Sequence, residues 1–320
     1  SAFQDDVDEL ALEELTHYAY ERMHPHWLEL RDAAAAAALP HRGDTVRWTA
    51  MKKMTERLVS HDLLEAPLIE RAYRKPLGYA GDFRTMTFVY ANALEGPSVV
   101  DRVFHKFVAT EPLAEGVRRR KDLMKQYTLA EHRRVQMERG SAHTRVLSLG
   151  CGPALEVREL AKDPDWRPTI HWTLVDQEPR ALSIAYTENF PAIRGGEQRR
   201  GEIRCLNVQL REIKDGFLIK EPFDFIYAAG LFDYLPTKTA MSLIRVLAGS
   251  LNVGGLIALG NARVDSTHFW VPEFLLDWTL LYRDEAQMLD LAAPLGTAFE
   301  AKVELEPAGA YWFLLIRRRA

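Results

Sequence analysis

The chain has 320 residues, of which 47% are hydrophobic and 27% are charged, values close to those of an average soluble globular protein. Its 41 basic and 45 acidic residues give a formal net charge of −4, so no general attraction to nucleic acids or anionic membranes is expected. The composition excludes a disordered tail protein, a collagen-like chain and a disulfide scaffold, and the length fits one large domain or two ordinary ones.

Cysteine usage and the first residues bear on the cellular compartment. The chain contains Cys151 and Cys205 as its two cysteines, which fits a reducing cytoplasm and provides no set of spaced thiolates for a metal cluster. Residues 1–6 are acidic and lack the basic and apolar regions of a signal peptide. No uninterrupted apolar run reaches the about 18 residues that a membrane-spanning helix needs. We expect a cytoplasmic protein with no membrane span and no bound metal.

Residues 5–139 have the pattern of a helical domain. Apolar residues recur at helical spacing near the N-terminus, and Ala33–Ala38 form a run of the strongest helix former. The segment 74–83 contains two glycines and a proline within six positions, which favours a loop. Helical patterns resume over 84–94, 98–109 and 113–138. The sequence predicts an all-helical N-terminal domain over residues 1–139.

From about residue 144 the pattern changes to short apolar runs separated by helical periods near 154–162, 179–189 and 238–251. The expected strands are Arg145–Leu149, Ile170–Val175, Glu202–Leu206, Phe223–Ala228, Leu256–Leu259, Lys302–Glu306 and Tyr311–Ile316. Strands that alternate with helices imply crossover connections and a mostly parallel sheet. The short link Pro307–Ala310 favours an antiparallel hairpin at the sheet edge. For residues 140–320 we predict a doubly wound, Rossmann-like α/β domain with a seven-stranded sheet whose last hairpin is antiparallel.

A glycine turn followed by an acid is the sharpest functional signal. Gly150 and Gly152 come directly after the first expected strand, where glycines let the backbone approach a ligand beside the amides of a helix N-terminus. Asp176 ends the next strand, 24 residues after Gly152, where a carboxylate accepts hydrogen bonds from ribose hydroxyls. A glycine turn without a ligand and a solvent-facing acid are the plain alternatives. Together the two features favour an adenosine-containing ligand.

The turn lacks part of the dinucleotide fingerprint. A pyrophosphate needs a third glycine, but Leu155 stands in that position and Pro153 follows the second glycine. The incomplete cradle favours a nucleoside without phosphates.

These residues carry a family resemblance. Leu149–Pro153, with Asp176 after the second strand, resembles the cofactor motif of class I S-adenosylmethionine-dependent methyltransferases. Further landmarks in the same order are Cys205–Val208, Phe223–Phe232 and Leu251–Ile257. The resemblance covers residues 142–320. It implies a methyltransferase domain over 140–320 that converts S-adenosylmethionine to S-adenosylhomocysteine, with residues 1–139 as a helical cap or substrate domain.

The resemblance also implies which residues contact the cofactor. They are Gly150, Cys151, Gly152, Pro153, Asp176, Gln177, Asn207, Val208, Ala229, Gly230 and Leu231. Asn207 stands where many members have Asp, and its amide is still able to accept from, and donate to, the adenine edge. Cys151 is expected to pack against the cofactor, since no base lies beside it in the sequence to make it a nucleophile. Asp224 is expected to order the turn before the fourth strand.

The sequence restricts the methyl acceptor. The loop Leu231–Pro236 lacks the Asn/Asp-Pro-Pro-Tyr type of motif that marks methylation of amide or base nitrogens. No basic arm with interleaved aromatic residues is present, so we expect a small-molecule acceptor and no nucleic acid. The aromatic stretch His268–Arg283 is either a helix burying its apolar face or the apolar wall of an acceptor pocket.

Five residues are candidates around the acceptor: Tyr79, Asp82, Asn261, His268 and Arg283. The loop with Tyr79 and Asp82 is either a tight turn between helices or a lid, and His268 is either a base, an orienting donor or a structural histidine. Arg283 either neutralises an acceptor carboxylate or pairs with a neighbouring acid, Asp277 or Asp284. The run Arg118–Arg120 is typical of a solvated helix face; the alternative is that one of these arginines binds the methionine carboxylate of the cofactor.

A narrower resemblance concerns the acceptor. Pro76–Phe83 and Asp277–Arg283 are similar to segments of bacterial methyltransferases that make 3-hydroxypalmitic acid methyl ester. This similarity implies carboxyl O-methylation of a fatty-acyl chain or a related small acid, and an acceptor with apolar character. Two alternatives remain: O- or N-methylation of a hydroxyl or amine on a secondary metabolite, and a non-catalytic module that binds S-adenosylmethionine. The sequence does not indicate the oligomeric state.

Overall fold

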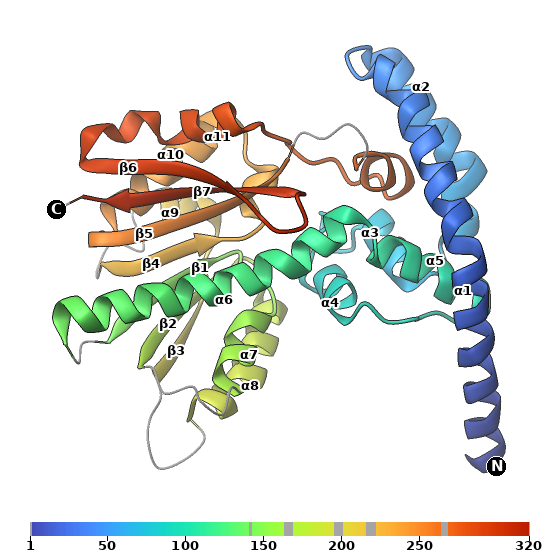
Figure 1. The fold of residues 1–320 in the computed structure, drawn as a ribbon, viewed down its shortest axis with the longest axis horizontal. Coiled ribbons are helices and arrows are strands. Elements are labelled where there is room, and N and C mark those ends of the chain that lie inside the picture. Colours follow the sequence, from blue (N-terminus) through green and yellow to red (C-terminus); the bar gives the residue numbers. More distant parts are fainter. Residues whose placement is uncertain are drawn as a thin grey trace. The chain divides into compact units, whose positions relative to one another are not determined.

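The computed structural model describes residues 2–140, 143–162, 169–194, 201–215, 222–263 and 268–319. The chain forms two compact units (Figure 1). Unit 1 comprises Ser1–Val117 and Asp265–Leu280, and unit 2 comprises Arg118–Val264 and Leu281–Ala320. The change of sequence pattern after residue 139 coincides with the end of helix α6 (Pro112–Arg139), whereas the compact units divide inside this helix. None of the described helices is long and apolar enough to span a membrane.

Unit 1 is helical, as the sequence predicts. Its main helices are α1 (Ala2–Ala38), α2 (Thr45–Thr55), α3 (Pro67–Arg74), α4 (Phe83–Ala91) and α5 (Val99–Ala109), joined in part by short turns at Leu39–His41, Glu56–Ser60 and His61–Leu63. Trp27 of α1 stacks on Phe107 of α5, with ring centroids 5.3 Å apart and an interplanar angle of 13°. The indole Nε1 of Trp27 donates to Glu111 Oε1 at 2.8 Å, so this buried ring also has its polar atom satisfied.

The aromatic segment after residue 267 packs into unit 1. It forms only a short π-helical turn, Val271–Leu275, in place of the longer helix that we considered. The rings of Phe269, Trp270 and Phe274 are buried. Trp270 contacts Trp27, and the ring centroid of Trp48 lies 4.8 Å from that of Phe274 and 5.3 Å from that of Phe269. Of the two alternatives for this segment, the structure shows burial of apolar side chains around a short helical turn. A role as the wall of an acceptor pocket stays a prediction.

Unit 2 contains the predicted seven-stranded sheet. The strands are β1 (Thr144–Leu149), β2 (Ile170–Asp176), β3 (Gly201–Asn207), β4 (Phe223–Ala228), β5 (Leu251–Ala262), β6 (Phe299–Leu305) and β7 (Tyr311–Arg318). Their order is β3-β2-β1-β4-β5-β7-β6. β1 to β5 pair in parallel, and β7 pairs antiparallel with both β5 and β6. The strand order reverses between β1 and β4, and ligands of doubly wound sheets bind beyond the carboxyl ends of the strands at such a point.

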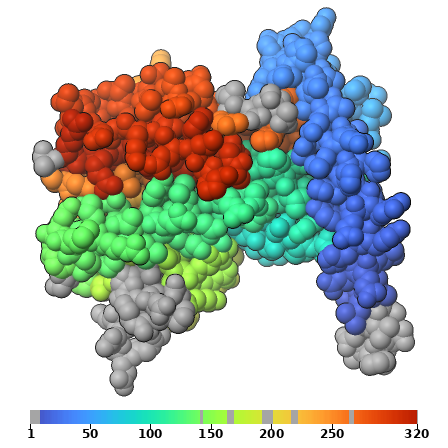
Figure 2. Space-filling view, viewed as in Figure 1, coloured from blue at the N-terminus to red at the C-terminus, as the bar shows by residue number. Residues whose placement is uncertain are grey.

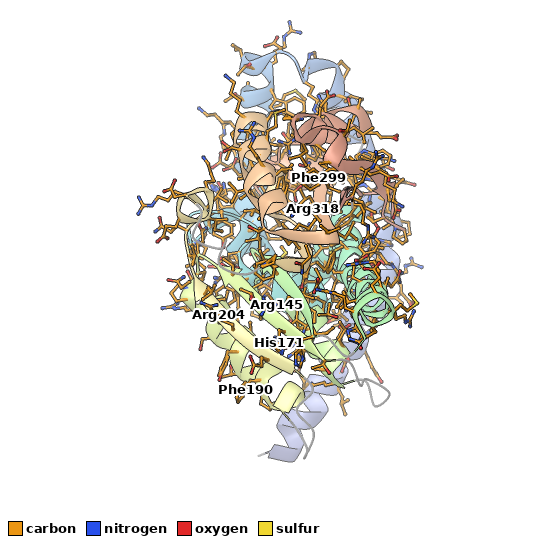
Figure 3. All side chains as sticks on the ribbon, turned by 90° about the vertical axis from the view of Figure 1, so that its left-hand side faces the viewer. Arg145, His171, Phe190, Arg204, Phe299 and Arg318 are labelled. Atoms are coloured by element: carbon orange, nitrogen blue, oxygen red, sulfur yellow. The ribbon has the colours of Figure 1, made fainter. Side chains whose placement is uncertain are left out.

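The register brings cross-strand partners together along the sheet. Arg145 of β1 lies opposite His171 of β2, and Phe299 of β6 lies opposite Arg318 of β7 (Figure 3). β5 starts five residues before the expected Leu256, because a register shift between Phe223 and Phe225 of β4 accommodates the additional residues. The apolar run predicted the paired core of this strand but not its irregular start.

Helices cover both faces of the sheet (Figure 1). Besides α6 they are α7 (Leu155–Lys162), α8 (Pro179–Arg194), α9 (Leu210–Lys214), α10 (Thr237–Gly249) and α11 (Glu285–Ala292), with short turns at Leu231–Tyr234 and Ala293–Ala298. Phe225 of β4 faces α6, where the ring of Tyr127 lies 6.4 Å away. Ile226, on the opposite face, belongs to the core cluster that includes Leu243 of α10. In Figure 2 the surface of α6 forms a green band below the β6–β7 hairpin.

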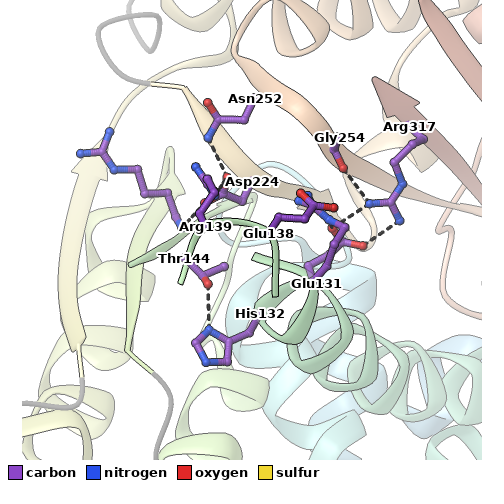
Figure 4. A network of polar contacts seen from close by, with 11 residues as sticks. Glu131, His132, Glu138, Arg139, Thr144, Asp224, Asn252, Gly254 and Arg317 are labelled. Carbon is purple, nitrogen blue, oxygen red and sulfur yellow. Dashed lines mark hydrogen bonds and ion pairs between the residues drawn. The ribbon is translucent and has the colours of Figure 1, made fainter. Parts of the chain in front are cut away.

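Polar contacts attach the C-terminal half of α6 to the sheet (Figure 4). Arg317 of β7 donates from Nη1 and Nη2 to the Glu131 carboxylate at 2.8 and 2.7 Å. Asp224, near the start of β4, accepts from Arg139, from the Asn252 side chain and from the backbone N–H of Arg145. These contacts join the amino-terminal end of β4 to α6, β1 and β5. The turn before β4, which Asp224 is expected to order, includes residues 216–221, which lie outside the described residues.

Candidate functional site

The chain turns sharply where β1 ends. Gly150 and Gly152 have φ angles of 61° and 54°, in the left-handed region that favours glycine, and Ala154 has φ 48°. A Cβ atom added to Gly152 would have no neighbouring heavy atom within 4 Å, so open space lies beside this backbone. The next helix, α7, begins at Leu155. The turn therefore exposes backbone at the carboxyl end of β1, the place where such sheets bind ligands.

Asp176 lies at the end of the neighbouring strand, β2, and is 7% exposed. Its Oδ2 accepts from the backbone N–H of Gly152 at 2.9 Å, and its Oδ1 accepts from the backbone N–H of Glu178 at 2.9 Å. Burial raises the pKa of this carboxyl, and the two backbone donors act in the opposite direction. Each carboxylate oxygen has a further lone pair, so an oriented acceptor for hydroxyl groups stands beside the glycine turn.

The end of β3 lies against the end of β2. Asn207 donates from Nδ2 to the backbone oxygens of Asp176 and Gln177, at 3.1 and 2.9 Å. These bonds orient the side-chain amide and direct its donor group to β2. Its Oδ1 is an acceptor by chemistry, suited to an exocyclic amino group. Val208, next in the chain, is 6% exposed and donates its backbone N–H to Asp176 O at 3.3 Å.

Cys151 and Pro153 complete the glycine turn. Cys151 is buried, its backbone N–H donates to Val175 O, and Pro153 is half-buried. Burial, followed by the nearby carboxylates of Asp176 and Glu156, raises the pKa of the Cys151 thiol well above its usual value. The thiolate, which is the nucleophilic form, is therefore disfavoured. This agrees with a packing role for Cys151.

The loop after β4 runs beside the same turn. Ala229 and Gly230 follow β4 directly, and a Cβ atom on Gly150 would lie 3.6 Å from Cβ of Leu231. The residues expected to contact the cofactor therefore lie together at the carboxyl ends of the neighbouring strands β1, β2, β3 and β4. Their contact with a cofactor remains a prediction.

Asn261 and Arg283, two of the five acceptor candidates, contact each other in unit 2. Arg283 is 4% exposed and donates to Asn261 Oδ1, to Phe232 O at 2.9 Å and to Leu235 O at 2.5 Å. Asn261, which is fully buried, donates from Nδ2 to Leu281 O at 2.8 Å. These bonds join the end of β5 to the loop after β4.

The alternative partners that we considered for Arg283 have other contacts. Asp277 pairs with Lys52 and Lys75, and Asp284 caps the N-terminus of α11. The alternative in which Arg283 pairs with one of these acids is therefore not what the structure shows for the described residues. In the part of the chain that the structure describes, the side chain of Arg283 donates its hydrogen bonds to uncharged oxygens of the loop and of β5, which gives it a positioning role.

Asp233 is a functional candidate that the sequence did not reveal. It lies in the loop after β4 and is 4% exposed, and its Oδ1 accepts from Ala262 N at 2.6 Å. Burial raises its pKa from 3.8 to about 6, although the Arg120 and Arg283 guanidinium groups act in the opposite direction. An acid within a loop carries no sequence signal for such burial, because the burial comes from strands and helices distant in the chain.

Tyr79, Asp82 and His268 belong to unit 1. Tyr79 and His268 are half-buried. Asp82 is fully buried and is the N-cap of α4: its Oδ1 accepts from the backbone N–H groups of Arg84 and Thr85, and from Arg71 Nε at 2.8 Å. These contacts fit the tight turn between helices that we considered for this loop. Roles for the three residues at an acceptor remain predictions.

No group of three or more His, Cys, Asp or Glu side chains suited to a metal ion occurs in the part of the chain that the structure describes.

Comparison with solved structures identifies the fold. A possible exported protein from Bordetella parapertussis matches with a TM-score of 0.56 and 18% identity, over 85% of this chain and 97% of the other. Magnesium protoporphyrin IX methyltransferase (ChlM) from Synechocystis PCC 6803, with bound S-adenosylhomocysteine, matches with a TM-score of 0.50 and 14% identity, over 79% and 98%. The chain shares the fold of class I methyltransferases. No protein-family model matches it, and no curated protein sequence matches it.

Proposed function

We propose that the chain is an S-adenosylmethionine-dependent methyltransferase that acts on a small molecule. The observation that carries the proposal is the hydrogen bond between the Asp176 carboxylate and the backbone N–H of Gly152, which builds one polar edge from the glycine turn and the second strand. A bare glycine turn occurs in many folds, but an oriented buried acid beside it suits a ribose.

The residues present fit the adenosine part of S-adenosylmethionine. The space beside Gly152 accepts a ligand at the backbone, Asp176 holds ribose hydroxyls, and Asn207 with Val208 flanks the adenine ring. Bound S-adenosylmethionine supplies an electrophilic methyl group. The residues of the chain bind and orient the two reactants and exclude water. The buried Asp233 and Arg283 hold the loop 229–235 in place. Rate enhancement then comes mainly from positioning.

For the acceptor we propose a carboxylic acid, either a fatty-acyl chain or a related small acid with apolar character. An ionised carboxylate is already a nucleophile at neutral pH, so its methylation needs no general base. Asn261 and Arg283, which bond to each other and to backbone oxygens, are proposed to position the loop after β4 beside the acceptor. The similarity of Pro76–Phe83 to the ester-forming bacterial enzymes adds to the proposal. Tyr79, Asp82 and His268 are then proposed to contact the acceptor.

The test is mass spectrometry of cell extract incubated with the protein and methyl-deuterated S-adenosylmethionine, before and after mild alkali. A labelled product that alkali hydrolyses is expected and identifies the acid. A labelled product stable to alkali would replace the ester by an ether or a methylamine. Binding of S-adenosylhomocysteine without any labelled product would favour a binding module, and no binding at all would overturn the proposal.

We also propose that the protein works in the cytoplasm. Cys151 and Cys205 are both thiols in the structure, which suits a reducing compartment. Fractionation of producing cells, followed by immunoblotting, tests this location.

A further inference from the structure

The long helix α1 has apolar residues on its outer side. Leu10, Leu15 and Tyr18 are 55% to 62% exposed. Glu14 and Glu21 lie on the same side of the helix, because residues three, four, seven or eight positions apart share a face. Both glutamates are exposed, and neither forms an ion pair within the part of the chain that the structure describes. We call these five residues the acidic stripe.

Another side of α1 is already packed. Thr16 is fully buried, Glu9 pairs with Arg102 of α5 at 2.9 Å, and the ring centroid of Tyr20 lies 5.5 Å from that of Phe107. The helix therefore needs no further apolar surface to attach it to unit 1. A helix at the surface of a globular protein normally has a polar outer face, so the apolar residues of the acidic stripe indicate a contact surface.

A second stripe follows α2 and the helical turn after it. Val46, Met54 and Leu58 are 56% to 79% exposed. Lys53 and Arg57, which are also exposed, share their face, and they form no ion pair among the described residues. We call these five residues the basic stripe. The other side of α2 packs through its tryptophan on the aromatic segment of unit 1.

The two stripes complement each other in charge. Residues 10–21 contain three acids and neither Lys nor Arg, whereas residues 46–58 contain four basic residues and one acid, which gives formal charges of −3 and +3. Both stripes belong to unit 1, and the exposure of their apolar side chains shows that they do not cover each other within one chain. Charged residues beside an apolar helix face select the helix that packs on it.

We propose that two copies of the chain associate through unit 1, with the acidic stripe of each copy against the basic stripe of the other. One chain carries both complementary surfaces, so a second copy provides two equal contacts related by a twofold axis. The apolar side chains of the stripes then cover each other, and the two glutamates of one stripe meet the lysine and the arginine of the other. The inference does not depend on the proposed function.

Sedimentation-velocity ultracentrifugation at micromolar concentrations provides the first test. The wild type is expected to be a dimer, with twice the chain mass of 36.5 kDa. An acid-reversed variant carries Glu14→Lys and Glu21→Lys, and a base-reversed variant carries Lys53→Glu and Arg57→Glu. Each variant by itself places like charges at both contacts, so the Kd of its dimer should rise at least about tenfold.

A mixture of the two reversed variants separates loss of this contact from loss of folding. In a mixed pair the reversed acids face the reversed bases at one contact, and the native charges face each other at the second contact. We therefore expect the mixture to dimerise with a Kd close to that of the wild type, although each variant alone does not.

Lys238→Glu combined with Glu285→Lys is the control, since it reverses two exposed charges of unit 2 and should keep the wild-type Kd. A monomeric wild type would overturn the inference and leave the stripes to a different partner. A dimer that either reversal leaves intact, a mixture that stays monomeric, or assemblies larger than a dimer would overturn it as well.

Discussion

The Asp176 carboxylate accepts a hydrogen bond from the backbone N–H of Gly152 at 2.9 Å, which ties the end of β2 to the glycine turn after β1. A second backbone donor, Glu178 N, holds the other carboxylate oxygen. The two backbone donors therefore hold the acid in one orientation. Preorganisation of this kind reduces the ordering cost that a ligand must otherwise offset on binding.

Replacing Asp176 by Ala should weaken S-adenosylhomocysteine binding by about 1–3 kcal/mol, the range for hydrogen bonds to a charged group. Isothermal titration calorimetry measures the change. Asp290→Ala, which removes an exposed acid of α11, serves as the control and should leave the affinity unchanged. Equal affinities of Asp176→Ala and the wild type would remove the ribose assignment.

Gly152→Ala separates strain from ligand contact. The φ angle of 54° costs an alanine about 1–2 kcal/mol of stability, and the added methyl enters the open space beside the turn. Gly309 of the β6–β7 turn is a matched control, because its φ is 79° and its added Cβ also meets nothing within 4 Å. Urea unfolding should show similar losses in the two alanine variants. Calorimetry should show loss of S-adenosylhomocysteine binding only in Gly152→Ala, and equal binding in both would contradict a ligand at this turn.

The sequence predicted the sheet well because its signals are local. Each of the seven apolar runs overlaps a strand, and the short link at Pro307–Ala310 predicted the antiparallel hairpin. The early start of β5 was missed, since Asn252–Gly255 contains two glycines that read as a turn. Within His268–Arg283, where a helix was one of two alternatives, Pro272 and the left-handed Asp277 confine regular structure to one short helical turn.

Long-range burial was not readable from the sequence. Residues 118, 119 and 120 are all arginines, but of the three only Arg120 is buried. It packs against Gly230 and Tyr311, which lie more than a hundred positions later in the chain. The burial of Asp233 was not predicted for the same reason. The glycine turn and Asp176 were readable because the first two strands of a doubly wound sheet place their ends side by side.

Asp233 should make stability depend on pH. Its pKa rises from 3.8 to about 6 in the folded protein, so between these values the folded state binds a proton that the unfolded state has lost. The resulting stabilisation is complete below about pH 4 and is lost as the pH rises through about 6, with an upper limit of about 3 kcal/mol. Asp233→Asn, which stays uncharged, should therefore gain stability relative to the wild type from pH 4 to pH 7. Urea unfolding at four pH values, with Asp290→Asn as the surface control, measures this difference, and a flat difference would argue against the raised pKa.

Arg283 should stabilise the loop after β4 through its bonds to Phe232 O, Leu235 O and Asn261. Because Arg283→Met leaves these buried oxygens without donors, we expect a loss of about 2–4 kcal/mol in the free energy of unfolding. Arg133→Met, an exposed arginine of α6, should change stability by less than about 0.5 kcal/mol. A double-mutant cycle with Asn261→Ala measures the coupling between the two side chains, expected at about 0.5–3 kcal/mol for residues in one network. Additive losses would show that Arg283 and Asn261 act independently, and Arg283 would then hold the loop through its two backbone acceptors alone.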